Sequence, residues 1–494
     1  MLLGIDFGTS FSQVSTIDSL GQPTLLLNPG EYGIPSEFYY DRESGILIGQ
    51  DALDAGQGTA AANLVSEVKM AILEGRSFTL DRRTFTAKEI VKEIYKTLVS
   101  KAVQIAGRRA IDTNIEGIVI SIPAKFGMQE CDLIRTAAEE CQGRNSWLPI
   151  KAIIKEPVAA ALAYYNKANV EDNKHILVYD LGGGTCDIAL VRSDSSLAEH
   201  YTVVDSDMVR LGGRNWDEKI VEYITQTTEH NAGVRIRGNV GFEEKIRRAA
   251  IAVKHDLSDP LKTRAMARVE LNGRIFTTPI TRVIFDEITL PLLKQTFDCL
   301  QNVYDRNASS CRIDEIICVG GSSNMLQVGE GIKKRFPQCS VRLYEPEHAV
   351  VNGAAIFAHM PQTGGSVTDK ASFSYGIGLH SHYGFPDDKM MVYNIVKRGM
   401  SLPATFTKGY CPVEYGQKSV TTGIYESEFL SDNYDFSNPH KRYIGMVELM
   451  LPPNSPTDLN LRCRLTLNSN GILEVEASEP SGRRVQATFK IRAL

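Results

Sequence analysis

The sequence has no apolar run long enough to cross a membrane. Its longest apolar runs, residues 117–123 and 176–181, have the length of β-strands, whereas a membrane-spanning helix needs about 20 consecutive apolar residues. The first ten residues, MLLGIDFGTS, also lack the basic start, apolar stretch and cleavage site of a secretory signal. We therefore expect a cytoplasmic protein without a transmembrane segment.

Paired cysteines and an excess of charge of one sign are missing too. The nine cysteines are scattered singly and form no CxxC pair, so we expect reduced thiols and neither a zinc site nor a disulfide framework. The 54 lysines and arginines oppose 59 acidic residues, for a net charge of −5. Without a basic face or polybasic tract, neither nucleic acid nor an anionic membrane is an expected partner.

The pattern of apolar and polar residues changes near residue 360. Before it, short β-branched runs alternate with helical stretches, such as a helix expected over residues 86–106, and this alternation is the pattern of an α/β architecture. Residues 361–372 are polar and contain glycine, as a linker does. Short alternating runs follow, separated by turn signals such as Asn470-Gly471. We therefore predict an α/β domain over 1–360, a linker over 361–372 and a small β-sandwich over 373–494.

Two strand-and-turn units resemble each other and indicate an internal duplication. The first is residues 4–9 (GIDFGT) and the second is residues 178–185 (VYDLGGGT). Each is followed by another strand, so each glycine turn joins a hairpin, whereas a P-loop or dinucleotide fingerprint opens a helix. This arrangement predicts a duplicated, two-lobed α/β domain of the actin-like ATPase type.

Both turns carry groups that bind phosphate. Their glycines let backbone N–H groups approach phosphate oxygens, and their Thr or Ser hydroxyls add donors. The carboxylates of Asp6, Asp180 and Asp187 would repel phosphate unless a hard cation lay between them, and hydrated Mg2+ meets that need. Residues 316–324 (IICVGGSSN) follow the pattern of a buried strand that opens a helix, as in a nucleoside-cradling turn. One such hairpin alone could be an ordinary turn, but three segments in series favour a nucleotide site.

In their residues and in their order along the chain, these motifs resemble those of the 70-kilodalton heat-shock (DnaK-type) chaperone family over nearly the whole chain. The matching segments are the phosphate loops at 4–10 and 180–187, the connecting segments at 119–124 (VISIPA) and 154–161 (IKEPVAAA), the adenosine loop at 320–323, the closing helix at 346–355, and a strand of the peptide-binding β-sandwich at 470–475. The resemblance implies an ATP-hydrolysing chaperone whose nucleotide domain is followed by a sandwich that binds unfolded or extended peptide.

The resemblance also implies roles for single residues. Lys69 would orient the attacking water and stabilise charge on the γ-phosphate, and Thr185 and Asp187 would position that water or accept its proton. Asp6, Asp180 and Glu156 would organise the hydrated Mg2+. From the residues alone, Lys69 could be a surface lysine and Glu156 a helix-start carboxylate favoured by the macrodipole.

The same resemblance places the nucleotide and the cofactors. The implied cofactors are ATP or ADP and Mg2+, with K+ as an additional candidate. The implied nucleotide contacts are Gly8, Thr9, Ser10, Phe11, Gly182, Gly183, Gly184, Gly212, Gly213, Lys254, His255, Ser258, Gly320, Gly321, Ser322, Asn324 and Glu347.

The adenosine pocket departs from the family's pattern. Ile251 and His255 stand where the family has Glu and Arg, and Asn324 replaces a second Arg. Loss of two guanidinium planes removes stacking on the purine, which predicts weaker ATP binding than is typical.

The linker and the lid depart as well. The family's leucine-rich linker is reduced to GSVTD at 365–369, Lys125 stands in place of an aromatic, and Cys131 in place of a linker-anchoring Arg. We therefore expect weak coupling between the domains. The sequence ends directly after the last predicted strand, so we expect no helical lid. Val420 and Thr422 align with the family's peptide pocket and are the expected peptide contacts.

Three functions remain open. The first is a lidless, chaperone-like ATPase that binds unfolded or extended peptide segments, with a J-domain co-chaperone or a nucleotide exchange factor as further partners. The second is a nucleotide-regulated scaffold with little ATP turnover. The third is a carbohydrate kinase of the same fold, which would give no role to the terminal β-sandwich.

Overall fold

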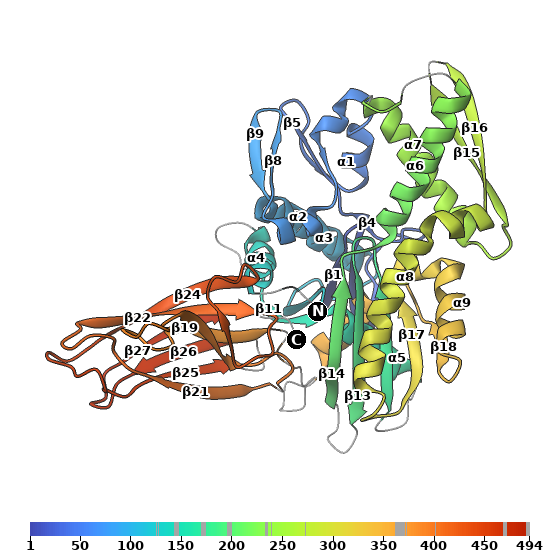
Figure 1. The fold of residues 1–494 in the computed structure, drawn as a ribbon. Helices are drawn as coiled ribbons and strands as arrows, with labels where there is room; N and C mark the ends of the chain where they lie inside the picture. The colour runs from blue at the N-terminus through green and yellow to red at the C-terminus, as the bar shows by residue number, and fades with distance from the viewer. Residues whose placement is uncertain are drawn as a thin grey trace. The chain divides into compact units, whose positions relative to one another are not determined.

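The computed structural model describes most of the chain, and Figure 1 shows its helices and strands. The described residues are 1–124, 126, 128–142, 148–168, 174–194, 200–232, 236–238, 240–271, 273–360, 371, 373–400, 402–467 and 472–490. Unit 1 comprises Met1–Ala124, Leu133–Ala198 and Ser206–Gly365, and unit 2 comprises Lys125–Asp132, Glu199–Asp205 and Ser366–Leu494. The predicted linker, apart from Ala371, lies outside the described residues, as do Lys125 and the turn at 470–471.

Unit 1 is built on two mixed sheets that share one strand order. In each sheet, a first strand pairs antiparallel with the strand that follows it and parallel with a strand from much later in the chain. The predicted hairpins are therefore present at both glycine turns. The first sheet has the order β11 (Ile150–Lys155), β10 (Gly117–Ile122), β1 (Leu2–Phe7), β2 (Phe11–Ile17), β3 (Pro23–Leu25), with β4 (Ile34–Pro35) beside β2. The second has the order β14 (His200–Val209), β13 (Cys186–Asp194), β12 (His175–Leu181), β17 (Ile313–Val319), β18 (Ser340–Leu343).

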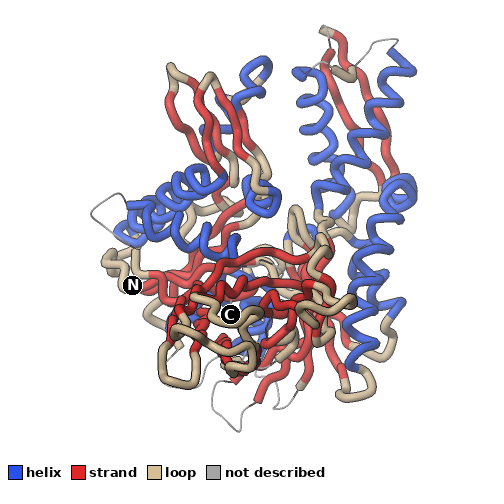
Figure 2. The backbone as a smooth tube through the Cα atoms, turned by 60° about the vertical axis from the view of Figure 1, so that its left-hand side comes forward, coloured by secondary structure: helices blue, strands red, loops and turns tan. Residues whose placement is uncertain are grey.

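Further elements are inserted into each half of unit 1. In the second half, the hairpin of β15 (Arg264–Leu271) and β16 (Arg274–Thr281) packs along α6 (Gly213–Ala232) and α7 (Val240–Ser258), as Figure 1 and Figure 2 show. The other elements up to residue 335 are β5 (Phe38–Asp41), β6 (Gly45–Ile48), α1 (Gln50–Ala55), η1 (Gly58–Asn63), β7 (Leu64–Val65), α2 (Val68–Glu74), β8 (Ser77–Leu80), β9 (Arg83–Thr86), α4 (Met128–Glu139), η2 (Glu140–Gln142), α8 (Arg282–Asn307), η3 (Gly321–Asn324) and α9 (Leu326–Arg335). No helix in the described ranges is both long and apolar enough to span a bilayer.

Local chemistry explains where α3 (Ala87–Arg108) begins. Thr86 accepts a hydrogen bond from the Glu89 backbone N–H, and the Glu89 side chain accepts one from the Thr86 backbone, which completes a capping box. Ten apolar residues of α3 are buried along one face, as the 3.6-residue period predicts. The predicted helix over 86–106 is thus present with slightly different bounds.

A glycine permits the close crossing of α5 (Glu156–Ala168) and α10 (Ala349–His359). A Cβ placed on Gly353 would lie 1.7 Å from the Ala159 carbonyl oxygen, which no side chain could occupy. Gly4 on β1 meets the same helix, because its Cβ would lie 2.2 Å from the Ala355 nitrogen. The two glycines therefore let α10 approach both α5 and the central strand of the first sheet.

Unit 2 contains two antiparallel sheets that share one apolar core. Leu461, Cys463, Leu465 and Leu467 alternate inward along β25, and Ile424 faces them from the other sheet. The first sheet has the order β23 (Asn433–Asp435), β20 (Met390–Val396), β19 (Ser374–His380), β22 (Ser419–Ser427), β24 (Lys441–Met450). The second has the order β21 (Ala404–Tyr410), β25 (Leu461–Leu467), β26 (Ile472–Ser478), β27 (Arg484–Lys490).

Candidate functional site

A cluster of four carboxylates and one lysine lies where strands of both sheets of unit 1 end. Asp6 lies near the end of β1 and Asp180 near the end of β12, directly opposite Asp187 on β13. Glu156 is the first residue of α5, immediately after β11, and Lys69 lies in α2. Lys69 Nζ donates to Glu156 Oε1, and both side chains are more than nine-tenths buried.

Burial shifts the pKa values of these groups away from their usual ranges. It raises the pKa of Glu156 to about 8 against the opposing effect of Lys69, and it raises the pKa of Asp180 well above its usual range, helped by Glu156 and Asp187. The pKa of Asp6 is raised by burial as well. Burial alone would lower the pKa of Lys69, but Glu156 and Asp6 outweigh it and keep the ammonium charged. One lysine therefore faces an excess of buried carboxylates.

This excess fits a hydrated divalent cation. Within the described residues, no three His, Cys, Asp or Glu side chains converge closely enough to hold a metal ion directly. Mg2+ commonly keeps several waters and contacts protein carboxylates through them. Buried carboxylates are the type of donor that suits Mg2+ held through water.

Two of the aspartates are fixed by the end of β10. Ser121 Oγ donates to Asp6 Oδ1 at 2.7 Å, and the Ala124 backbone N–H donates to Asp187 Oδ1 at 2.8 Å. The Ser121 side chain, two residues before Pro123, and the Ala124 backbone, directly after it, thus both contact the carboxylate cluster. The sequence did not single out Ser121, because a serine within a buried strand carries no signal of its own.

The two predicted phosphate loops face each other at contact distance. A Cβ placed on Gly183 would lie 2.6 Å from Ser10 Oγ, and one on Gly184 would lie 3.1 Å from Thr9 Oγ1. A larger residue at either glycine would crowd Ser10 or Thr9, so the loops from the two hairpins lie against each other. Thr185 at its edge is buried, and its carbonyl accepts a hydrogen bond from the Gly182 N–H at 3.0 Å.

The remaining glycine segments join this surface from the second half of unit 1. Gly212 precedes α6, and Gly213 begins it; the Gly213 N–H donates to the Gly182 carbonyl at 2.9 Å. A Cβ on Gly213 would lie 2.2 Å from Ser322 Oγ, and one on Gly320 would lie 2.4 Å from Asp180 Oδ1. Gly320 has a φ of +80°, which favours glycine there. The structure therefore brings together four segments that are remote in the sequence.

Residues predicted around adenosine lie on α7, on η3 and before α10. Lys254 Nζ donates to the Gly213 carbonyl at 3.1 Å and pairs with Asp217 at 2.8 Å. Ser258 Oγ instead donates to the Lys254 carbonyl of its own helix. Burial and the neighbouring Lys254 lower the pKa of His255, so its ring is neutral at pH 7.

Other predicted nucleotide contacts are less enclosed. Gly321 and Asn324 lie in η3, where Asn324 Nδ2 donates to the Gly321 carbonyl at 3.1 Å. Glu347 precedes α10 and is partly buried, and Phe11 at the start of β2 is 46% exposed. The glycine turn at 320 leads into the short 3-10 helix η3 and then α9, so the strand is followed by helical structure as predicted. Contact of these residues with a nucleotide remains a prediction.

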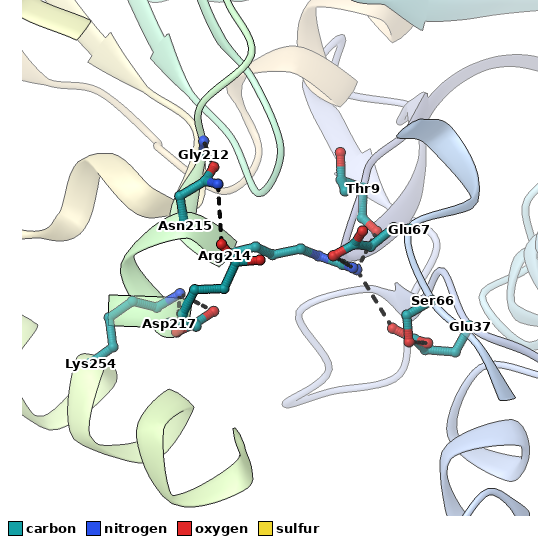
Figure 3. Close-up of polar contacts among 10 residues, drawn as sticks. Thr9, Glu37, Ser66, Glu67, Gly212, Arg214, Asn215, Asp217 and Lys254 are labelled. Atoms are coloured by element: carbon teal, nitrogen blue, oxygen red, sulfur yellow. Dashed lines mark hydrogen bonds and ion pairs between the residues drawn. The ribbon is translucent and has the colours of Figure 1, made fainter. Parts of the chain in front are cut away.

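Arg214, which the sequence reasoning missed, links the two phosphate loops. Its backbone N–H donates to the Gly183 carbonyl at 3.0 Å, and its Nη2 donates to the Thr9 carbonyl at 3.0 Å. Figure 3 shows its side chain extended from the start of α6 towards Glu67 and Glu37, with ion-pair distances of 2.8 and 3.7 Å. Its position directly after Gly212-Gly213 was the available signal.

Tyr95 is a second residue that was missed. It lies on the buried face of α3, and its hydroxyl has no hydrogen-bond partner among the residues that the structure describes. Burial raises the pKa of Tyr95 well above its usual range, and Asp6 and Glu156 contribute to that rise. A tyrosine at a helix-core position looks like any other apolar residue in the sequence, so nothing marked it.

The residues predicted to contact peptide lie on β22 in unit 2. Thr422 is fully buried, and its Oγ1 lies 3.3 Å from the Tyr410 hydroxyl. Val420, two residues earlier, packs partly buried against the same core. Both point to the interior side of their sheet, and of the two only Val420 retains exposed surface. A peptide contact there remains a prediction.

Comparison with known proteins finds one family over most of the chain. The model of the Hsp70 protein family matches residues 75–493. Among similar proteins are two ribosome-associated molecular chaperones, one from Eremothecium gossypii and one from Zygosaccharomyces rouxii. Each is 27% identical to this chain over 97% of this chain and 80% of the relative.

Proposed function

The chain belongs to the Hsp70 family, and we propose that it is a molecular chaperone that binds ATP with Mg2+ and hydrolyses it to ADP and phosphate. Members of this family are ATPases. The observation that carries the proposal is the buried Lys69–Glu156 pair among three aspartates, at the strand ends where the two phosphate loops face each other. We further propose that the repeated sheets form the two lobes of an actin-like ATPase domain over 1–360.

In this proposal the loops bind the phosphates and the buried side chains act on water. Backbone N–H groups of the two glycine turns hold the β- and γ-phosphates. Lys69 Nζ, held in place by Glu156, stabilises negative charge on the γ-phosphate. Thr185 orients the water, and Asp187, itself held by the Ala124 N–H, accepts the water's proton as the bond to the leaving ADP oxygen breaks.

Asp6, Asp180 and Glu156 would hold the cation. When bound, Mg2+ would neutralise charge on the transferring phosphate. The excess of buried carboxylates supports this assignment, with K+ as a further candidate near the phosphates. The altered residues on α7 and η3 support the expectation of weaker adenosine binding than is typical for the family.

For the sandwich over 373–494 we propose binding of unfolded or extended peptide. The relatives' names support this, since both are described as ribosome-associated molecular chaperones. Val420 is the residue of the predicted pocket with exposed surface. A J-domain co-chaperone and a nucleotide exchange factor are the further partners that the family suggests.

Single-turnover hydrolysis with Lys69→Ala tests the ATPase proposal. We expect the rate constant to fall at least about 100-fold, since charge stabilisation of the transition state is lost, while ATP still binds. The control is Lys245→Ala, which removes an exposed lysine of α7 whose Nζ donates to the Glu270 carbonyl.

Equal rates for wild type and Lys69→Ala would contradict the assigned role of Lys69. Tight ATP binding with no turnover in the wild-type chain would instead favour the nucleotide-regulated scaffold. A burst of ADP that requires a sugar would favour the carbohydrate kinase.

A further inference from the structure

We propose that Arg214 is a positioning residue for ATP hydrolysis, which holds the two phosphate loops together and keeps Lys69 at Glu156. The inference rests on the proposed function and adds a residue that acts through others. Arg214 begins in the second half of unit 1, at the start of α6, and its side chain ends in the first half (Figure 3).

The backbone of Arg214 is fixed to the second phosphate loop. Its N–H donates to the Gly183 carbonyl at 3.0 Å, next to the bond from Gly213 to the Gly182 carbonyl at 2.9 Å. Asn215 Oδ1 accepts from the Gly212 N–H at 3.0 Å and closes the turn. Two backbone hydrogen bonds therefore join the start of α6 to the second loop.

The side chain of Arg214 is fixed to the first phosphate loop and to two glutamates. Nη2 donates to the Thr9 carbonyl at 3.0 Å, and Nη1 lies 2.8 Å from Glu67 Oε1. Glu37 lies 3.7 Å away and is itself held by the Ser66 hydroxyl. The side chains of Arg214 and Glu37 are only 16% and 10% exposed. Loss of the guanidinium would therefore remove one of the two arginines, Arg214 and Arg247, that act on this nearly buried carboxylate.

Glu67 connects this ion pair to the lysine of the site. It precedes α2 with φ 64° and ψ 31°, a left-handed conformation that is unfavourable for a residue with a Cβ. Its carbonyl accepts from the Met70 and Ala71 N–H groups at 2.9 and 3.0 Å, so it sets the direction of the first turn of α2. Its carboxylate makes no capping bond in the described structure and pairs with Arg214 instead.

Lys69 follows Glu67 by two residues, within that first turn. Without Arg214, the strained turn at Glu67 loses its ionic partner and the two loops lose a direct link. Lys69 Nζ would then sample positions away from Glu156 and the phosphate. Catalysis is sensitive to such displacement, because a shift of about 1 Å in a positioned group can cost about 100-fold in rate.

The test measures kcat and the Kd for ATP separately in Arg214→Lys, Arg214→Ala and Glu67→Gln. We expect kcat to fall about 10- to 100-fold in Arg214→Ala and Glu67→Gln, and less in Arg214→Lys, which keeps the charge but loses the forked geometry. The Kd for ATP should change no more than about threefold. The matched control is Arg248→Ala, which breaks an exposed ion pair with Glu244 on α7.

A charge exchange adds a readout that general loss of structure would not produce. Arg214→Glu and Glu67→Arg should each lower kcat, and the double variant should recover part of it. Unchanged kcat in Glu67→Gln and Arg214→Lys would overturn the inference, even if Arg214→Ala failed to fold. A rise in the Kd for ATP as large as the expected fall in kcat, with kcat itself unchanged, would overturn the inference too. Arg214 would then bind the nucleotide directly. Absence of turnover in the wild-type chain would overturn the proposed function and this inference together.

Discussion

At the scale of single residues, two buried tyrosines differ in how their hydroxyls are satisfied. Tyr95 and Tyr179 are both fully buried in unit 1. The Tyr179 hydroxyl donates to Thr296 Oγ1 at 2.8 Å, whereas in the described part of the chain the Tyr95 hydroxyl has no hydrogen-bond partner. A buried hydroxyl without a hydrogen-bond partner destabilises the folded protein, whereas one that forms a hydrogen bond stabilises it.

Replacing each tyrosine with phenylalanine should therefore have opposite effects. We expect Tyr179→Phe to lower the free energy of unfolding by about 1 kcal/mol, because it leaves Thr296 without its donor. Tyr95→Phe should leave stability unchanged or raise it. Urea unfolding of the two variants in parallel measures the difference, and equal losses in both would show that the Tyr95 hydroxyl has a partner in solution.

At the scale of elements, the crossing of α5 and α10 depends on one glycine. Gly353 lies where a Cβ would clash with the Ala159 carbonyl. Gly329 on α9 is a matched contrast, because nothing in the described structure lies within 4 Å of where its Cβ would be. The same substitution therefore meets a closed contact in one helix and open space in the other.

Gly353→Ala should destabilise the protein, while Gly329→Ala should stabilise it. The first forces α10 away from α5 and should cost about 2 kcal/mol or more, as overpacked sites do. The second removes backbone entropy from the unfolded chain and should contribute about 0.5–1 kcal/mol. Thermal unfolding of both variants measures this, and a stable Gly353→Ala protein would mean that the two helices lie further apart.

At the scale of the whole molecule, each unit has its own core and its own proposed task. The predicted nucleotide contacts lie in unit 1, and Val420 packs against the apolar core of unit 2. Val485 on β27 packs partly buried against that same core from the second sheet. The two valines therefore offer similar packing on different sheets of one unit.

Val420→Phe should weaken binding of an extended apolar peptide, whereas Val485→Phe should not. We expect a loss of about tenfold for Val420→Phe, because the larger ring fills the predicted pocket, and a rate of ATP hydrolysis equal to wild type. Fluorescence anisotropy of a labelled peptide measures the affinity. Equal losses in both variants would indicate disturbed packing and would remove Val420 from the proposed peptide site.

The sequence predicted elements well where local chemistry sets them. The helix over 86–106 was visible from its periodicity, and the capping box at Thr86 and Glu89 starts it in the structure. Both hairpins were visible because glycine turns follow β-branched strands, and both are present. Bounds and short elements were less accessible. Just before the 3-10 helix, for example, a Cβ on Gly320 would lie 2.4 Å from Asp180 Oδ1, and such a tertiary approach is not visible in the sequence.

By itself the sequence determined the α/β character of the chain before residue 360, the two glycine-turn hairpins, the sandwich strands and the family. Each of these depends on patterns within about ten neighbouring residues or on motif order. Only the tertiary structure decided which side chains meet. Lys69 and Glu156 are separated by 87 residues in the sequence, and Arg214 and Thr9 by 205. How strongly each pair interacts depends on its burial in the folded protein. The connection that Arg214 makes between the two phosphate loops exists only when both sheets are folded, because its two ends belong to different halves of unit 1.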